Sequence, residues 1–288
     1  MSIRHPVLIA MLAMLSANIA LSLNDALIKQ THGVLGLWTI FMLRSFVSLP
    51  LVVLATAVMK VPLWPQQFWG VSLRTGLLLI GWVALYSALP FLPIANATAV
   101  VYTIPIIIVC LTAVLDWRWP RWGVTAAVIV GFVGVILIAR PEEGSISPAY
   151  ILPIVSALTY AIAMIFSNRK LVVEHALTIA VNLNIGFLLM GTIGVLATAN
   201  DPLIVIRLAV SEQSTMFLYM GLCLVVGTIG VAVAYQSAAP TLVSTVDYSY
   251  LVFAILWGVL FFAEVPSPLA MIGMGFIAVA GFLAMRRS

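Results

Sequence analysis

Three charged side chains lie inside long apolar stretches of this 288-residue chain, namely Asp25, Arg44 and Asp247. A charge within an apolar span is costly, so such a residue is a functional candidate by default. The planar guanidinium of Arg44 could bind both oxygens of a carboxylate. Asp247 could pair with an ammonium group or carry a proton. Two structural alternatives stay open: a packing salt bridge between Arg44 and Asp25, and a helical ion pair between Asp25 and Lys29.

Polar side chains also recur at helical spacing in these stretches, so that each set shares one face of a helix. The set in the first stretch comprises Asn18, Ser22, Asp25 and Lys29. All faces together give twelve candidate substrate-binding residues: Asn18, Ser22, Asp25, Arg44, Trp82, Tyr86, Thr98, Tyr102, Ser156, Tyr160, Asp247 and Tyr250. These faces could line one cavity, or they could form the interhelical hydrogen bonds that hydroxyl side chains often provide in membranes.

The candidate residues restrict the kind of solute. An aromatic-rich cavity with few charges suits a zwitterion with an apolar side chain. It suits a multiply charged phosphate poorly, because Arg44 is the only deep cation among the candidates.

The composition shows where these residues must work. Apolar residues make up 64 % of the chain and charged residues 8 %, against about 25 % in a soluble domain. This chain cannot cover a water-facing surface with charge, which excludes a soluble monomer, and its hydrophobicity excludes disorder. The natural solvent is a lipid bilayer, and the loops between spans are too short to hold a soluble domain.

We predict an all-α integral membrane protein with ten transmembrane helices. The spans are expected at about 6–28, 35–59, 69–89, 93–115, 122–139, 148–167, 177–199, 214–238, 242–262 and 267–285. Lys and Arg in the short loops favour one side by eight to three, which predicts that both termini are cytoplasmic. Arg74, one turn into the third span, is expected to extend toward the inner interface.

The two halves of the chain show a weak internal repeat. At an offset of 148 residues, Tyr102 matches Tyr250 and Asp116 matches Glu264. We assign a first repeat to residues 1–140, a linker to 141–147 and a second repeat to 148–288. Five spans per repeat is an odd number, so the halves enter the membrane from opposite sides. Such inverted repeats are typical of transporters with a substrate site near mid-membrane.

The chain resembles the drug/metabolite transporter superfamily in its EamA branch. The resemblance covers essentially the whole chain and rests on Asn24-Asp25-Ala-Leu-Ile-Lys29, Leu43-Arg44-Ser45, Tyr102-Thr-Ile-Pro105, Leu115-Asp116, Tyr248-Ser-Tyr250 and Ala263-Glu264. Two departures are Asp116, where the family more often has Glu, and Phe253, which stands where the first copy has Pro105. The family carries amino acids, nucleotide sugars, vitamins and cationic drugs. Amino-acid exporters of the YddG type resemble the chain in size and layout, and importers of S-adenosylmethionine and riboflavin resemble its Asn-Asp-Ala opening.

These patterns predict a secondary transporter of the inner membrane, most simply an exporter of amino acids with apolar or aromatic side chains. The alternative is an importer of a larger metabolite such as S-adenosylmethionine or riboflavin. An enzyme is disfavoured because the spans contain no paired aspartates, Ser/His pair or zinc motif. A channel is disfavoured by the repeat.

We expect no cofactor, metal or nucleic-acid partner, since the histidines are isolated and no phosphate-binding loop occurs. The expected partners are a small-molecule substrate and the bilayer. The fifth and tenth spans carry glycines that permit close helix contact, as a scaffold or as a homodimer face.

Overall fold

Apolar segments of about 20 residues fold into long α-helices in the computed structural model, which describes residues 4–30, 36–88, 91–92, 97, 100–119, 121–139, 148–199, 201–263 and 267–287. The helices are α1 (Arg4–Gln30), α2 (Leu37–Val58), α3 (Phe68–Ala88), α5 (Ile104–Asp116), α6 (Trp122–Ala139), α7 (Ile151–Lys170), α8 (Ala176–Thr198), α9 (Pro202–Ser237), α10 (Pro240–Asp247), α11 (Ser249–Phe262) and α12 (Pro268–Arg287). A 3-10 turn over Pro148–Tyr150 precedes α7, and the described residues contain no strand.

Seven segments of the described residues are long and apolar enough to cross a membrane. They are Pro6–Gln30, Leu37–Val58, Phe68–Ala88, Pro148–Lys170, Ala176–Thr198, Gln213–Ser237 and Pro240–Phe262. The other three predicted spans contain shorter apolar helices, namely α5, α6 and α12. The chain is therefore an all-helical, multi-pass membrane protein.

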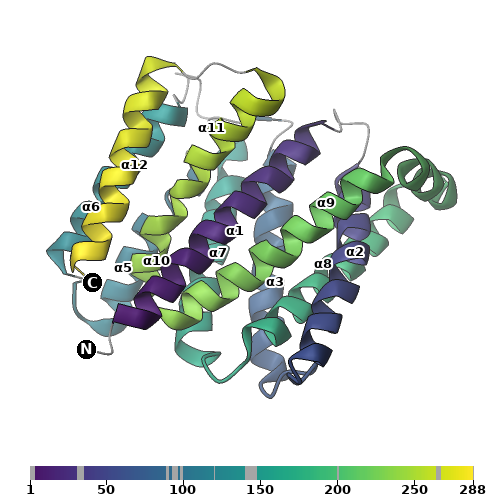
Figure 1. The fold of residues 1–288 in the computed structure, drawn as a ribbon, viewed down its shortest axis with the longest axis horizontal. Helices are drawn as coiled ribbons and strands as arrows, with labels where there is room; N and C mark the ends of the chain where they lie inside the picture. The colour runs from purple at the N-terminus through teal and green to yellow at the C-terminus, as the bar shows by residue number, and fades with distance from the viewer. Residues whose placement is uncertain are drawn as a thin grey trace.

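Helices from the first half of the chain pack against helices from the second half. In Figure 1, α1 lies beside α9 and α6 beside α12, and these are two of the most extensive contacts in the molecule. The other extensive contacts join α2 to α8 and α3 to α7, and α1 also packs on α10 and α11. The two halves thus interlock. Both termini lie at the same end of the bundle (Figure 1).

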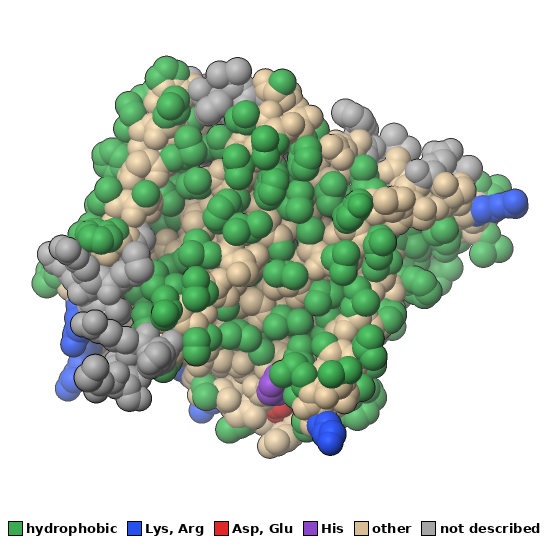
Figure 2. Space-filling view, in the orientation of Figure 1, with side chains coloured by type: hydrophobic (Ala, Val, Ile, Leu, Met, Phe, Trp, Pro, Cys, Tyr) green, Lys and Arg blue, Asp and Glu red, His purple; other side chains and the backbone are tan. Residues whose placement is uncertain are grey.

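The exterior of the bundle is apolar. Figure 2 shows hydrophobic side chains over most of the visible face, with lysine and arginine at its margins. Tryptophans at helix ends are exposed as well, among them Trp69, Trp117 and Trp122. Such a surface is unsuited to water and suited to lipid, with the tryptophans at a depth where aromatic belts form.

Candidate functional site

A cavity of about 420 Å³ lies between α1, α3, α5, α7, α10 and α11. It extends from Asp247 to Lys29 and Phe262, at the far ends of α1 and α11. We call that end of the bundle the Lys29 end. Ten of the twelve candidate residues line the cavity: Asn18, Ser22, Asp25, Trp82, Tyr86, Tyr102, Ser156, Tyr160, Asp247 and Tyr250. Apolar residues such as Leu78 and Leu251 complete the wall, and the volume suits a small molecule.

Asn18 on α1 bridges the interruption between α10 and α11. Its Nδ2 donates to the Ser249 hydroxyl at 3.0 Å and to the carbonyls of Asp247 at 3.2 Å and Val246 at 3.4 Å. Buried carbonyl groups need a partner, and the bilayer interior offers no water to supply one. Asn18 therefore holds the α10–α11 junction against α1 at the base of the cavity.

The next two members of the same face hold α11 against α1. Trp257 Nε1 donates to the Ser22 hydroxyl at 3.0 Å. The Tyr250 hydroxyl donates to the Asp25 carboxylate, which also accepts from Asn24 Nδ2 at 3.1 Å. The polar face expected from the helical spacing is thus one continuous contact with α10 and α11.

Lys29 is an exposed residue that lines one end of the cavity. Its Nζ lies 4.4 Å from the centroid of the Phe262 ring, a cation–π distance. Asp25 takes its hydrogen bonds from other residues. The helical ion pair expected as one alternative for Asp25 and Lys29 is therefore not what satisfies this carboxylate.

Asp247 lies among tyrosines. The ring centroid of Tyr102 is 6.4 Å from that of Tyr248, and the centroid of Tyr160 is 6.5 Å from that of Tyr235. Asp247 lines the cavity together with Tyr102 and Tyr160. A carboxylate beside aromatic rings can bind an ammonium group through charge and cation–π attraction together.

Arg44 does not line the cavity. Its side chain is 1 % exposed, and its guanidinium carbon lies 4.7 Å from the ring centroid of Phe41 and 4.9 Å from that of Phe187. It is 5.9 Å from the ring centroid of Trp82, which does line the cavity. No ion pair joins Arg44 to Asp25, so the expected packing salt bridge is absent. The predicted carboxylate clamp lies one side-chain layer behind the cavity wall.

Arg74 contradicts the expectation that it extends toward the membrane interface. It is 1 % exposed, because α7 and α8 pack over its side of α3. Its Nε and Nη1 make no hydrogen bond, and its charge acts on Tyr160. Hydropathy alone could not show that neighbouring helices cover this position.

Some predicted features lie outside the described residues. They are the candidate Thr98, Glu264 of the repeat, and the linker 141–147. The network also includes two residues that are not among the twelve candidates, Ser249 and Trp257. Trp257 is seven residues after Tyr250, two helical turns along the same face, and that spacing identifies it. Ser249 has no such signal, because its role depends on the interruption of the helix.

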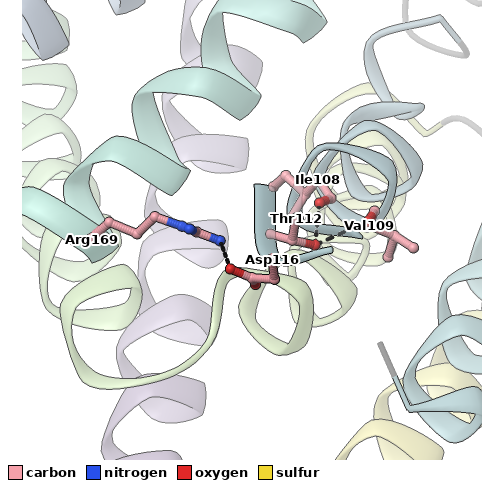
Figure 3. Close-up of polar contacts among 5 residues, drawn as sticks. All are labelled: Ile108, Val109, Thr112, Asp116 and Arg169. Carbon is pink, nitrogen blue, oxygen red and sulfur yellow. Dashed lines mark hydrogen bonds and ion pairs between the residues drawn. The ribbon is translucent and has the colours of Figure 1, made fainter. Parts of the chain in front are cut away.

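We call the opposite end of the bundle the Arg169 end. Between it and the cavity lie packed apolar side chains that include Ile104, Ile108, Met164 and Val243. Beyond them, Arg169 Nη2 on α7 lies 2.7 Å from Asp116 Oδ1 on α5 (Figure 3). An ion pair between the two halves of the chain therefore lies at this end.

Asn168 adds a second link at the Arg169 end. Its Nδ2 donates to the carbonyls of Tyr235 at 2.8 Å and Ala238 at 3.0 Å. These two carbonyls belong to the C-terminal end of α9. Asn168 therefore fixes α7 to α9 beside the ion pair.

The helices define a multi-pass membrane protein, and the cavity between them is large enough for a small molecule. No protein-family model matches the chain. The riboflavin transporter of Rhizobium johnstonii is 30 % identical over 223 residues, which cover 76 % of this chain and 70 % of that protein. The chain belongs to the same family of membrane transporters.

Other relatives include both importers and exporters. The pseudopaline exporter CntI of Pseudomonas aeruginosa is 24 % identical over 287 residues, covering 99 % of this chain and 97 % of that protein. The S-adenosylmethionine uptake transporter of Rickettsia conorii is 29 % identical over 108 residues, covering 36 % of this chain and 35 % of that protein. The relatives therefore indicate a transporter of small molecules, and they leave the direction and the solute open.

The fold has a counterpart among solved structures. One crystal structure superposes with a TM-score of 0.79 at 18 % identity, covering 99 % of this chain and 100 % of that one. At this identity the likeness establishes the fold alone.

Proposed function

We propose that the protein is a secondary transporter of the EamA branch of the drug/metabolite transporter superfamily, which exports amino acids with apolar or aromatic side chains across the inner membrane. The observation that carries the proposal is the cavity between the two halves, which extends from Asp247 to Lys29 and is lined by Tyr86, Tyr102, Tyr160 and Tyr250. A substrate site between two repeats is what alternating access requires.

The pattern of helix contacts supports the inverted repeat. If a two-fold axis relates the halves, each contact must occur twice with the roles of the halves exchanged. The first span of one half packs on the third span of the other in α1–α9, and again in α7–α3. The second spans pair in α2–α8 and the fifth spans in α6–α12. This arrangement is the one expected for ten spans in two inverted five-helix repeats.

Interrupted helices at the cavity support the same architecture. Tyr102 lies in a turn ahead of α5, and Tyr248 lies between α10 and α11. The two interruptions face each other, with the tyrosine rings 6.4 Å apart. Discontinuous helices at corresponding positions of two repeats are typical of substrate sites in secondary transporters.

The lining favours a solute with an amino group and an apolar body. Asp247 supplies the charge for the ammonium group, and the tyrosines supply cation–π surface. The stacked pair Trp82 and Tyr86, with ring centroids 5.6 Å apart, offers a flat apolar wall for a side chain. With the N-terminus cytoplasmic, the Lys29 end of the cavity lies toward the outside, where an exporter releases its solute.

An importer of a larger, flatter solute is the second candidate. It is favoured by the relationship to the riboflavin transporter, and the Trp82–Tyr86 wall would stack on a ring system equally well. Riboflavin has no ammonium group, so Asp247 could bind it only as a hydrogen-bond acceptor for hydroxyl or N–H groups.

Counterflow in liposomes containing the purified protein tests the proposal. The vesicles are preloaded with unlabelled amino acids, S-adenosylmethionine, riboflavin or nucleosides, and uptake of each labelled tracer is followed. We expect saturable exchange of phenylalanine, tyrosine, tryptophan or leucine, and loss of most of that exchange in Asp247→Asn. Exchange of riboflavin or S-adenosylmethionine alone would reject the amino-acid assignment in favour of the second candidate.

The matched control is Asp201→Asn, which removes a carboxylate far from the cavity. Asp201 caps α9 by accepting from the amides of Leu203 and Ile204, both at 3.1 Å. The amide oxygen of asparagine preserves this capping, so exchange should stay at the wild-type level. Equal losses in the two variants would mean that Asp247 has no special role.

A further inference from the structure

The guanidinium of Arg44 is buried, and no carboxylate among the described residues forms an ion pair or hydrogen bond with it. Its Nε and Nη2 are buried and make no hydrogen bond. Asp25 acts on it electrostatically, but that carboxylate takes its hydrogen bonds from Tyr250 and Asn24. The Phe41 and Phe187 rings stabilise the positive charge and supply no hydrogen-bond acceptor. A buried charge with unsatisfied donors is costly, so the position calls for an anionic partner.

Only one layer of side chains separates Arg44 from the cavity. The side chain of Trp82 lies between the two: its ring contacts the Arg44 guanidinium, and it also lines the cavity. Tyr86 stacks on Trp82 at an interplanar angle of 19°, and it also lines the cavity. A rotation of Trp82 about its side-chain torsions would open a direct path from the cavity to the Arg44 nitrogens.

We propose that Arg44 is a carboxylate-binding site behind a movable wall, reached by the substrate when Trp82 turns aside. This inference rests on the proposed function and deepens it, since it assigns the acidic group of the solute to Arg44 and the ammonium group to Asp247. The guanidinium offers two parallel N–H donors to the two carboxylate oxygens. The protein then recognises both charges of a zwitterion, from opposite sides of the cavity.

Binding to the purified wild-type protein provides the first test and requires no substitution. Dissociation constants are measured by calorimetry for L-phenylalanine and L-phenylalaninol, which share the ring and the ammonium group and differ in the carboxylate. We expect phenylalanine to bind about 10- to 100-fold more tightly, the range that charge-assisted hydrogen bonds give. Equal binding overturns the carboxylate site and leaves the proposed function standing. Binding of neither compound overturns the proposed function together with this inference.

Arg44→Gln is the decisive variant, and Arg74→Gln is its matched control. Both arginines are 1 % exposed and have unbonded nitrogens, but Arg74 has no contact with Trp82. Arg44→Gln should bring the phenylalanine/phenylalaninol ratio close to one while phenylalaninol still binds. Arg74→Gln should leave the ratio unchanged, whatever it does to the two affinities. Should Arg44→Gln fail to give a monodisperse protein, Arg44→Lys replaces it, with a smaller fall in the ratio expected because lysine lacks the planar fork. A ratio that stays at the wild-type value overturns the proposal.

Thiol labelling tests the movable wall separately. In a chain whose Cys110 and Cys223 are replaced by alanine, Arg44→Cys is treated with a small water-soluble methanethiosulfonate. Labelling should be slow with Trp82 in place and about tenfold or more faster in the Trp82→Ala background, where the barrier is gone. Leu43→Cys, buried on another side of α2, should not change its rate. Equal rates at position 44 in both backgrounds would overturn the role of Trp82.

Discussion

At the scale of single residues, a few polar side chains on α1 position the discontinuous α10–α11 segment. Asn18, Ser22 and Asp25 each bond to a different part of it. Each residue lies one helical turn from the next, so one face of α1 contacts the whole segment. The same side chains line the cavity, so these residues both hold the helices together and shape the site.

Asn18→Ala should destabilise the protein, because it removes the donor that satisfies the α10–α11 junction. Leaving buried carbonyls without a partner costs about 1–3 kcal/mol. The thermal unfolding midpoint of the purified protein should fall by about 2–10 °C. The control is Ser16→Ala, two residues away, whose hydroxyl is exposed and bonds to the Leu12 carbonyl of its own helix. A midpoint shift of equal size in both variants would contradict the role of Asn18.

Helical spacing predicted which polar residues share a face, because a 3.6-residue period fixes that face before any partner is known. It could not predict the partners. Arg44 was expected to reach the solute directly, yet its position depends on how the rings of Phe41 and Phe187 pack around it. Burial of Arg74 likewise depends on neighbouring helices. Tertiary packing determines the positions of both arginines, and the periodicity of a single sequence does not reveal that packing.

At the scale of helices, α6 and α12 approach each other closely at two glycines. A Cβ on Gly134 would meet the Gly273 carbonyl oxygen at 2.6 Å, and a Cβ on Gly273 would meet that of Gly134 at 2.6 Å. Both contacts are to backbone, which cannot move aside. The close contact expected of these glycines is thus confirmed within one chain, where it supports a scaffold.

Gly134→Ala should separate these helices and lower stability by about 1–3 kcal/mol, the usual effect of overpacking. Gly275→Ala is the matched control, since a Cβ there would meet nothing within 4 Å and would replace a poor helix former. Melting curves of the two purified variants give the comparison. Similar midpoints for Gly134→Ala and the wild type would show that α6 and α12 tolerate a wider spacing.

The Asp116–Arg169 pair should bias the protein toward the conformation closed at the Arg169 end. Both side chains are partly exposed, so breaking the pair is expected to change the free-energy difference between the conformations closed and open at this end by about 0.2–1 kcal/mol. The ratio of the two populations would then change by up to about fivefold. In a chain without Cys110 and Cys223, Ile108→Cys in the apolar cluster reports opening through its labelling rate. Asp116→Asn should raise that rate modestly.

Exchanging the two charges separates the ion pair from each residue alone. Asp116→Arg combined with Arg169→Asp should return the Ile108→Cys labelling rate toward the wild-type value. Lys170→Gln, which removes a neighbouring exposed charge, is the control and should change nothing. A double exchange that raises the Ile108→Cys labelling rate further would show that the Asp116–Arg169 ion pair does not hold this end together.

Hydropathy predicted the spans well and their breaks poorly. The segment 202–212 was expected to be a loop, yet it forms the first part of α9, capped by Asp201 and kinked at Gln213. The ninth span was expected to be continuous, yet it is divided into α10 and α11 at Tyr248. Averaged apolarity measures whether a segment enters the bilayer. It carries no information on a one-residue interruption that a distant side chain stabilises.

At the scale of the whole molecule, the interlocked halves link the two ends of the cavity. Every extensive contact pairs a helix of one half with a helix of the other, so neither half can move without sliding against its partner. A movement that opens the Arg169 end would therefore have to separate the apolar side chains around Ile108 and shift the contacts between the two halves.

Which membrane face each end occupies decides whether the described cavity is the loading or the release conformation. We expect the Lys29 end to face outward. In cells expressing a chain without native cysteines, an impermeant maleimide should label Gly36→Cys, which is exposed beside the start of α2. It should label Val172→Cys, exposed between α7 and α8 at the Arg169 end, only after lysis. Labelling of Val172→Cys in intact cells would reverse the orientation. The open cavity would then face the cytoplasm, as the loading state of an exporter must.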